Sequence, residues 1–355
     1  MTEFDLIRSI SSRFQVPEGL TGIGDDCAVI PGASEDTLVT TDLLAEGVHF
    51  LVDCISPFDL GYKSAAVNIS DIAAMGGLPK YAFLSLALPK EYTAPGADCG
   101  WLTAFMDGFT ACCRRYGVTL LGGDTSASSG GIFINVTLMG TCPHGTALMR
   151  SSARPGDLIC VTGTLGDSAA GLRLIKEADA DTDAAFLLRR HCHPEPRVAE
   201  GLALRQCPGI HAMMDLSDGL ASDLPHILEA SGKCDFSQHS EATKKRDLPH
   251  SFGASSDDVD NIGKGLSESK LTKALGATID VRSLPLSAEL RSLCSARGWD
   301  PIDLAICGGE DYELLFTMAP GTLPPIPCTV IGTITPSPKL LWLGGRDHYD
   351  GFRHF

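Results

Sequence analysis

The segment TTDLLAEGVHF, residues 40–50, decides which fold class the chain belongs to. Apolar and β-branched residues at 37–41 predict a strand that leads into Asp42. In α/β folds, ligands gather at strand ends and in the adjoining loops. The hydroxyl and carboxylate oxygens found here are hard ligands that suit Mg²⁺. The segment therefore predicts an α/β protein with a site at this point.

The same arrangement, in which a small or hydroxylated residue precedes an acid, recurs along the chain. It appears as GIGDD at 22–26, NISD at 68–71, GGD at 122–124, MDLSDG at 214–219 and GGEDY at 308–312. A single aspartate after a glycine is more often a turn or a helix cap. Six such elements, if clustered, would repel one another by ~4 kcal/mol per pair at 4 Å and an effective dielectric of 20. We therefore expect several divalent cations to neutralise them and to bind a phosphorylated ligand.

Length and charge narrow the class of protein. The 355 residues suggest about two domains. The chain carries 44 acidic and 28 basic side chains, a net charge of −16, which argues against binding to nucleic acid or to an anionic membrane. Thirteen scattered cysteines without a C-x-x-C pair, and no visible signal peptide, predict reduced thiols in a cytoplasmic protein.

Familiar nucleotide and catalytic motifs are absent from the sequence. It contains no P-loop, no G-x-G-x-x-G, no H-E-x-x-H and no G-x-S-x-G. A nucleotide would therefore need another source of positive charge. Arg150, beside the presumed domain boundary, is the natural candidate, whereas we interpret Lys63, on a helix of small residues, as structural.

Proline and glycine at 141–156 mark a domain boundary, which predicts domains at 1–146 and 147–355. Helices are expected at 9–14, 61–75, 101–116 and, after a glycine turn at 163–166, through residue 175; strands are expected at 37–41, 81–88, 118–121, 132–139 and 158–161. Residues 235–270 contain seven serines, twelve charged residues and only eight apolar ones. A segment of this composition buries too little apolar surface to offset the entropy lost on ordering, so we predict a mobile surface insertion.

Taken together, these motifs resemble the thiamine-monophosphate kinase family, and the resemblance covers nearly the whole chain. It implies a mixed α/β fold with two domains, of the aminoimidazole-ribonucleotide-synthetase-like type. The N-terminal sheets would pair across a homodimer, and the C-terminal domain would be an α/β sandwich. The family's activity is transfer of the ATP γ-phosphoryl group to thiamine monophosphate, with several Mg²⁺ ions and ATP as co-substrate.

The resemblance also implies a role for each matching residue. Metal ligands would be Asp26, Thr40, Thr41, Asp42, Asp71, Asp124, Asp215 and Asp218, among which Asp42, Asp71 and Asp124 would be catalytic. ATP would contact Met106, Gly123, Asp124, Arg150 and Ser217. Thiamine monophosphate would contact His49, Glu310 and Phe352.

Two other functions stay open at this point. A different ATP-using synthetase of the same superfamily would keep the fold and change the acceptor. A noncatalytic cation-binding protein is less well supported, because no D-x-[DN]-x-[DN]-G loop occurs.

Overall fold

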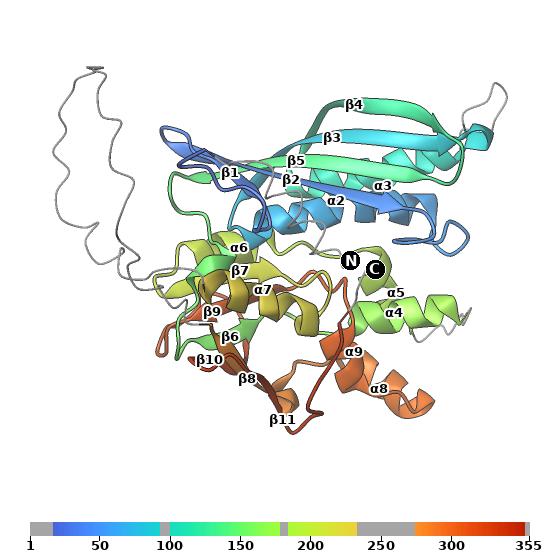
Figure 1. The fold of residues 1–355 in the computed structure, drawn as a ribbon. Helices are drawn as coiled ribbons and strands as arrows, with labels where there is room; N and C mark the ends of the chain where they lie inside the picture. Colours follow the sequence, from blue (N-terminus) through green and yellow to red (C-terminus); the bar gives the residue numbers. More distant parts are fainter. Residues whose placement is uncertain (1–16, 93–99, 178–183, 233–273, 352–355) are drawn as a thin grey trace, which may run out of the picture.

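The structure is a computed structural model that describes residues 17–92, 100–177, 184–232 and 274–351. The predicted helix at 9–14, the whole of the predicted insertion at 235–270, and Phe352 lie outside the described residues. The chain forms two sheets, each with its own helices, in a two-domain α/β fold (Figure 1). No helix in the described ranges combines the length and apolarity needed to cross a membrane.

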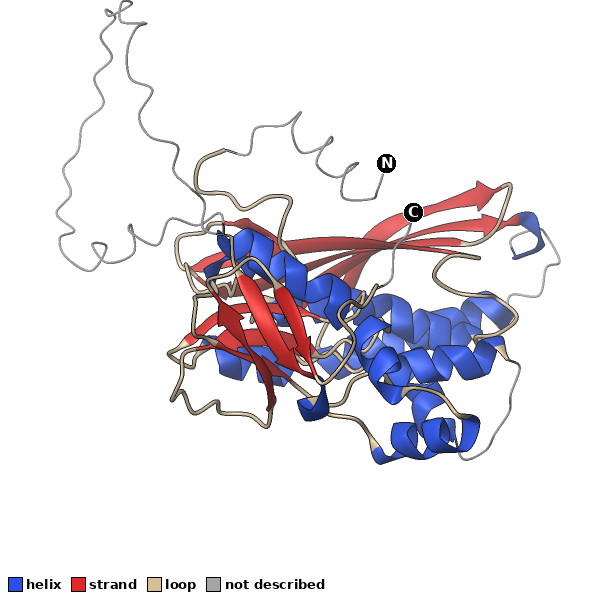
Figure 2. Ribbon diagram, turned by 60° about the horizontal axis from the view of Figure 1, so that its bottom comes forward, coloured by secondary structure: helices blue, strands red, loops and turns tan. Residues whose placement is uncertain are grey.

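The N-terminal sheet has the order β1-β2-β5-β3-β4. Its strands are β1 (Ala28–Ile30), β2 (Glu35–Ala45), β3 (Leu78–Pro89), β4 (Thr119–Ser128) and β5 (Phe133–Pro143). Only β4 runs parallel to its neighbour. Burial alternates along β2 and β5, so one face of the sheet packs while the other faces outward. Helices α2 (Pro57–Ala74) and α3 (Gly100–Tyr116) lie beneath the packed face, and the short 3₁₀ turn η1 (Lys90–Tyr92) follows β3 (Figures 1 and 2).

Helix α2 connects the two halves of the molecule. Its start is fixed by Ser56, whose hydroxyl accepts from the Asp59 amide, and by a proline in the first turn. Fourteen of its eighteen residues are buried, because it packs against β2 and β5 on one side and against β7, α5 and α6 on the other. Gly61 and Gly108 let α2 and α3 touch: a Cβ on Gly108 would lie 1.8 Å from the Phe58 carbonyl oxygen.

The C-terminal sheet has the order β11-β8-β10-β6-β9-β7. Its strands are β6 (Leu158–Val161), β7 (Ile210–Asp215), β8 (Gly276–Asp280), β9 (Leu314–Met318), β10 (Thr329–Thr335) and β11 (Leu340–Leu343). Its helices are α4 (Asp167–Lys176), α5 (Ala185–Cys192), α6 (Val198–Arg205), α7 (Leu220–Gly232), α8 (Ala288–Arg297) and α9 (Pro301–Cys307), with 3₁₀ turns η2 (Arg150–Ser152) and η5 (Val281–Ser283). Strand β7 ends at Asp215, beside α2.

Expected elements in the described ranges are present, but the positions of three aspartates correct the predicted pattern. Only Asp215 ends a strand as expected. Asp42 and Asp124 lie inside β2 and β4, which continue for several residues beyond them. Asp71 lies in the last turns of α2 rather than at a strand end. The small residues before each acid were read as strand terminators, whereas they allow close packing within the elements.

A buried charge network holds the segment before β9 in place. Glu313 is fully buried and accepts from Arg190 Nη2 at 2.8 Å and from Arg197 Nε at 2.7 Å. The Thr162 hydroxyl donates to the same carboxylate at 2.6 Å. The network ties α5 and α6 to the C-terminal sheet immediately after the 308–312 motif. It therefore fixes the position from which that motif enters the space between the two sheets.

We expect Glu313→Gln to lower the free energy of unfolding by about 3 kcal/mol, because buried Arg190 and partly buried Arg197 would lose their counter-charge. Urea denaturation monitored by circular dichroism measures the change. Glu177→Gln is the matched control, since its ion pair with Arg173 is on the surface, and it should change stability by less than about 0.5 kcal/mol. Equal effects in the two variants would contradict the interpretation.

Candidate metal and phosphate site

Three carboxylates from distant parts of the sequence meet between the two sheets. Asp26, Asp71 and Asp215 each offer an oxygen that lies within 4.8 Å of the other two. They come from the loop before β1, from α2 and from the end of β7. Within the described ranges, no other group of potential metal ligands comes together in this way. The predicted convergence of the acidic motifs is therefore present for these three.

Each carboxylate has a specific partner. Thr40 Oγ1 donates to Asp71 Oδ2, and Ser70 Oγ donates to Asp215 Oδ2, both at 2.5 Å. Arg150 Nη2 donates to Asp26 Oδ1 at 2.5 Å and is the cation of the cluster. Neighbouring Asp25 instead accepts from the Arg150 amide at 3.1 Å, which holds the loop in place.

Burial and mutual repulsion raise the pKa of several of these acids. Burial, followed by the charge of Asp26, raises the pKa of Asp42 to about 6 and that of Asp215 to about 7. Burial and then Asp42 and Asp215 also raise the pKa of Asp71 well above its usual range. One arginine is therefore too little positive charge for this cluster at neutral pH.

This donor set fits Mg²⁺. It consists of carboxylate and hydroxyl oxygens, which are the ligands that this hard cation prefers. The raised pKa values, caused by burial and by the neighbouring aspartates, agree with a cluster that is short of positive charge, which a divalent ion would supply. Asp26, Asp71 and Asp215 are the residues that would hold such an ion, with Thr40 beside them.

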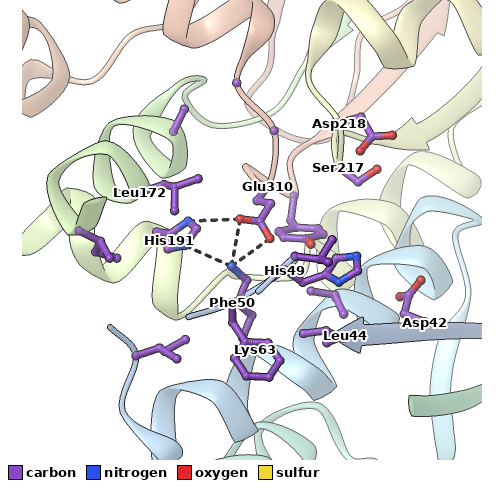
Figure 3. Close-up of a pocket in the computed structure, with 18 of the residues that line it drawn as sticks. Asp42, Leu44, His49, Phe50, Lys63, Leu172, His191, Ser217, Asp218 and Glu310 are labelled. Carbon is purple, nitrogen blue, oxygen red and sulfur yellow. Dashed lines mark hydrogen bonds and ion pairs between the residues drawn. The ribbon is translucent and has the colours of Figure 1, made fainter. Parts of the chain in front are cut away.

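A cavity of about 580 Å³ opens from this cluster. Asp42, Asp71 and Asp215 line one end of it, together with Ser217 and Asp218. Figure 3 shows Asp42, Ser217 and Asp218 on one side of the cavity and Leu172 and His191 on the other, with Glu310 and His49 between them. The cavity thus has an acidic end and an end where apolar and polar side chains mix.

The motif at 308–312 reaches the cavity through an unusual backbone. Glu310 and Tyr312 both have positive φ, 64° and 52°, which is rare for residues with a side chain. The Glu310 amide donates to the Ser217 carbonyl at 2.7 Å, and the Tyr312 amide donates to the Leu216 carbonyl at 2.9 Å. These bonds hold the strained loop directly beside the acidic end.

His49 is fixed in one tautomer. Its Nδ1 accepts from the Ala45 amide at 3.0 Å, so the ring proton of the neutral form lies on Nε2. His49 lines the cavity, as the motif at 40–50 predicts for a substrate contact.

The residues of α3 and β4 that were expected to bind the nucleotide lie away from the carboxylate cluster. Met106 packs, half-buried, against the N-terminal core. Asp124 pairs across the sheet with Ser85, Ser85 with Asn135, and Asn135 with Leu43 of β2. These three strand spacings amount to about 14 Å. Gly123 and Asp124 of the same chain are therefore not part of the carboxylate cluster.

Thr41 also lies on the outward face of the sheet, where its hydroxyl donates to the Val136 carbonyl at 3.2 Å. Its alternation with Thr40 and Asp42 places it away from the cluster.

Two residues that line the cavity were not predicted from the sequence to belong to the site. Lys63 was interpreted as structural, and His191 was given no role, yet both line the cavity. The signal for Lys63 was its position eight residues before Asp71, which places both on one face of a helix. No comparable signal exists for His191, because it comes from a different helix of the other domain.

Comparisons with known proteins agree with this architecture. The family model described as AIR synthase related protein, N-terminal domain, matches residues 24–142, and the model for the C-terminal domain matches residues 154–236. The structure of the HypE–HypF complex covers 97% of this chain and 98% of its own, with a TM-score of 0.64 at 17% identity, which shows a shared fold alone. The fold and the acidic centre thus define an AIR synthase-related protein.

More similar proteins identify the branch of this class. The thiamine-monophosphate kinase of Salmonella typhimurium is 41% identical over 320 residues, which is 89% of this chain and 80% of that protein. The structure of AaThiL complexed with AMPPCP and TMP has a TM-score of 0.80 and 32% identity, and covers 100% of this chain and 97% of its own. The chain belongs to the thiamine-monophosphate kinase family.

The raised pKa values predict an unusual pH dependence of stability. A carboxyl whose folded pKa exceeds its unfolded value stabilises the protein at low pH, and this stabilisation is lost as pH rises through the folded pKa. At pH 8 without divalent cations, Asp215→Asn should therefore melt a few °C above the wild type, and the difference should shrink toward pH 5.

Differential scanning fluorimetry in EDTA and in Mg²⁺ measures this effect. Mg²⁺ should stabilise the wild type more than Asp215→Asn. Asp347→Asn, on the surface, is the control and should follow the wild type. An Asp215→Asn protein that is less stable than the wild type at pH 8 in EDTA would contradict the prediction.

Proposed function

We propose that this protein phosphorylates thiamine monophosphate, using ATP, to give thiamine diphosphate and ADP. The observation that carries the proposal is a cavity joining a carboxylate cluster, which could hold a cation, to a mixed apolar and polar end. Family membership supports the same reaction, because relatives of this chain are named for it and AaThiL is complexed with AMPPCP and TMP.

The proposed chemistry needs little beyond positioning and charge neutralisation. The acceptor is a phosphate oxygen that is already ionised at neutral pH, so no strong general base is required. Asp26, Asp71 and Asp215, with Thr40 and Asp42, would hold Mg²⁺, and Asp218 would hold a further ion. Magnesium bound there would neutralise charge on the phosphates of both molecules.

Two residues of this chain would act as donors. Arg150, the partner of Asp26 in the carboxylate cluster, has five N–H groups, so it can serve a nucleotide phosphate oxygen as well as Asp26. His49 lines the cavity and keeps its proton on Nε2 because Nδ1 accepts from a backbone amide, so it can donate to the substrate but is unsuited to remove a proton. Ser217 also lines the cavity.

The direct test is product analysis with ATP, Mg²⁺ and three acceptors offered separately: thiamine monophosphate, thiamine and an aminoimidazole precursor. We expect thiamine diphosphate and ADP in equal amounts, and only with the first. Asp71→Asn should reduce turnover ~10²-fold or more, and Asp42→Asn similarly, because the transferring group would lose charge stabilisation. ADP formation only with another acceptor would replace the proposal by the synthetase alternative. Near-normal turnover of Asp71→Asn would reject that residue's role.

We also propose that the working form is a homodimer that completes the nucleotide site. The outward face of the N-terminal sheet exposes large apolar side chains, including Leu43, Phe83 and Leu121, which favours burial against another protein surface. Asp124 lies on this face, because cross-strand partners share a face and its row includes Leu43. A second copy whose β4 edge paired with the β1–β2 edge of this sheet would bring its own Gly123 and Asp124 toward the first copy's acidic end.

Subunit complementation tests this arrangement. Asp42→Asn and Asp124→Asn homodimers should each be nearly inactive. When the two are unfolded together and refolded, mixed dimers contain one site with both substitutions and one with neither. Up to about a quarter of wild-type activity should then return, since half of the dimers are mixed and each has one intact site. No recovery, with mixed dimers verified by two affinity tags, would place Asp42 and Asp124 in the same chain's site.

We propose the boundary between domains at 146/147, giving domains 1–146 and 147–355. The two family models support it, because the first ends at 142 and the second begins at 154. We propose a cytoplasmic location, which fits the use of ATP and the free cysteines of the described ranges.

A further inference from the structure

A lysine is completely buried in the wall of the cavity, eight residues before Asp71 on α2. Lys63 has a side-chain exposure of 1%, and its Nζ lies 3.0 Å from each carboxylate oxygen of Glu310. His191 Nε2 lies 3.5 Å from the same nitrogen (Figure 3). Buried lysines are rare unless they are paired, so this position has a specific use.

The donors and acceptors of the group can be assigned. Lys63 Nζ has three protons, which meet Glu310 Oε1, Glu310 Oε2 and His191 Nε2. His191 Nε2 is therefore an acceptor, and Nδ1 carries the ring proton, 3.0 Å from Ser168 Oγ and 3.3 Å from Glu310 Oε2. Burial and then Lys63 lower the pKa of His191 to about 3, which agrees with a neutral ring.

Glu310 is the member of this group that is most accessible to a ligand. Its side chain is 26% exposed, compared with 1% for Lys63 and 7% for His191. Oε2 is engaged by Lys63 and His191, whereas Oε1 has one contact and a remaining lone pair. Burial opposes ionisation of Glu310, but Lys63 and His191 outweigh it and lower the carboxyl's pKa. Glu310 is thus held as an oriented, ionised acceptor at the cavity wall.

The ionised carboxylate of Glu310 accepts hydrogen bonds, so it favours a ligand group that donates one. A phosphate would be repelled by the carboxylate, and the acidic cation-binding end lies on the other side of His49 (Figure 3). Leu172, on the same side of the cavity as His191 (Figure 3), and Ile175 are apolar lining residues that suit an aromatic ring. Thiamine monophosphate carries one neutral N–H donor group on its rings, the amino group of the pyrimidine.

We propose that Lys63 is a positioning residue that, with His191, aims Glu310 Oε1 at the amino group of the acceptor's pyrimidine ring. Lys63 itself touches neither phosphate. The inference rests on the proposed function for the identity of the acceptor. It goes further, because it places the pyrimidine end of thiamine monophosphate at Glu310 and names the buried residues that orient Glu310.

The experiment compares wild type, Lys63→Met, His191→Asn and Glu310→Gln, with Lys339→Met as an exposed lysine control. Steady-state kinetics vary thiamine monophosphate and ATP separately, and isothermal titration calorimetry measures binding of thiamine monophosphate in Mg²⁺. For Lys63→Met we expect KM and Kd for thiamine monophosphate to rise about tenfold or more, with kcat and the KM for ATP within about threefold. His191→Asn should show the same pattern more weakly, which preserves the test if Lys63→Met does not fold.

A substrate analogue tests the contact between Glu310 and the pyrimidine amino group. Oxythiamine monophosphate has oxygen in place of this amino group, so it presents a hydrogen-bond acceptor where the substrate presents a hydrogen-bond donor. The wild type should discriminate against it by about thirtyfold or more in kcat/KM, and Glu310→Gln should reduce that discrimination about tenfold, because the glutamine amide can donate. In the double variant Lys63→Met/Glu310→Gln, the loss should be smaller than the product of the two single losses, because no unpaired charge remains.

Several outcomes would overturn the inference. The inference would be wrong if Lys63→Met left the KM for thiamine monophosphate unchanged, or lowered only kcat or ATP binding. It would also be wrong if wild type and Glu310→Gln discriminated equally between thiamine monophosphate and oxythiamine monophosphate, or if the wild type did not bind thiamine monophosphate. Failure of the proposed function is distinct: the wild type would bind thiamine monophosphate but form no thiamine diphosphate, and calorimetry of the variants would still decide the role of Lys63.

Discussion

Repulsion among buried carboxylates is the constraint to which the rest of this structure responds. Asp26, Asp71 and Asp215 approach within 4.8 Å at the junction of the two domains, with Arg150 as the cation of the cluster. Such an arrangement costs stability unless positive charge is added. The three acids come from three separate segments: the loop before β1, helix α2 and the end of β7. The proposed binding of divalent cations and phosphates would offset this cost.

Helix α2 places the two ends of the cavity on one rigid body. Lys63 and Asp71 lie eight residues apart on it, which is about 12 Å along the helix axis. Asn68 of the same helix accepts from the Asp42 amide at 3.1 Å, so α2 also fixes the strand that supplies the next acid. Because α2 is buried on both sides, these side chains cannot drift relative to one another. The acidic end of the cavity and the Lys63–Glu310 pair are therefore held at a fixed separation.

The sequence was sufficient to predict the fold class, the acidic character of the site and the membership of Asp26, Asp71 and Asp215. Those predictions succeeded because small residues next to acids report a local requirement for close packing, which a one-dimensional pattern preserves. Asp124 shows where such reasoning fails. Its motif resembles the others, yet β-sheet register places it three strands from Asp42. Register depends on pairings between residues far apart in the chain, which no local pattern encodes.

Lys63 and His191 illustrate a second limit, which concerns charge rather than position. A lysine amid small residues on a helix is normally a solvated or structural side chain, and a lone histidine is most often a satisfied core residue. Their meaning appears only when Glu310 arrives from a third segment, on a loop with left-handed backbone geometry that Ser217 and Leu216 hold in place. A glutamate paired with a fully buried lysine must be oriented by it, since the lysine has no solvent in which to move. Where two charged side chains are paired in a cavity wall and one is far more buried than the other, the buried charge determines which way the more accessible one points.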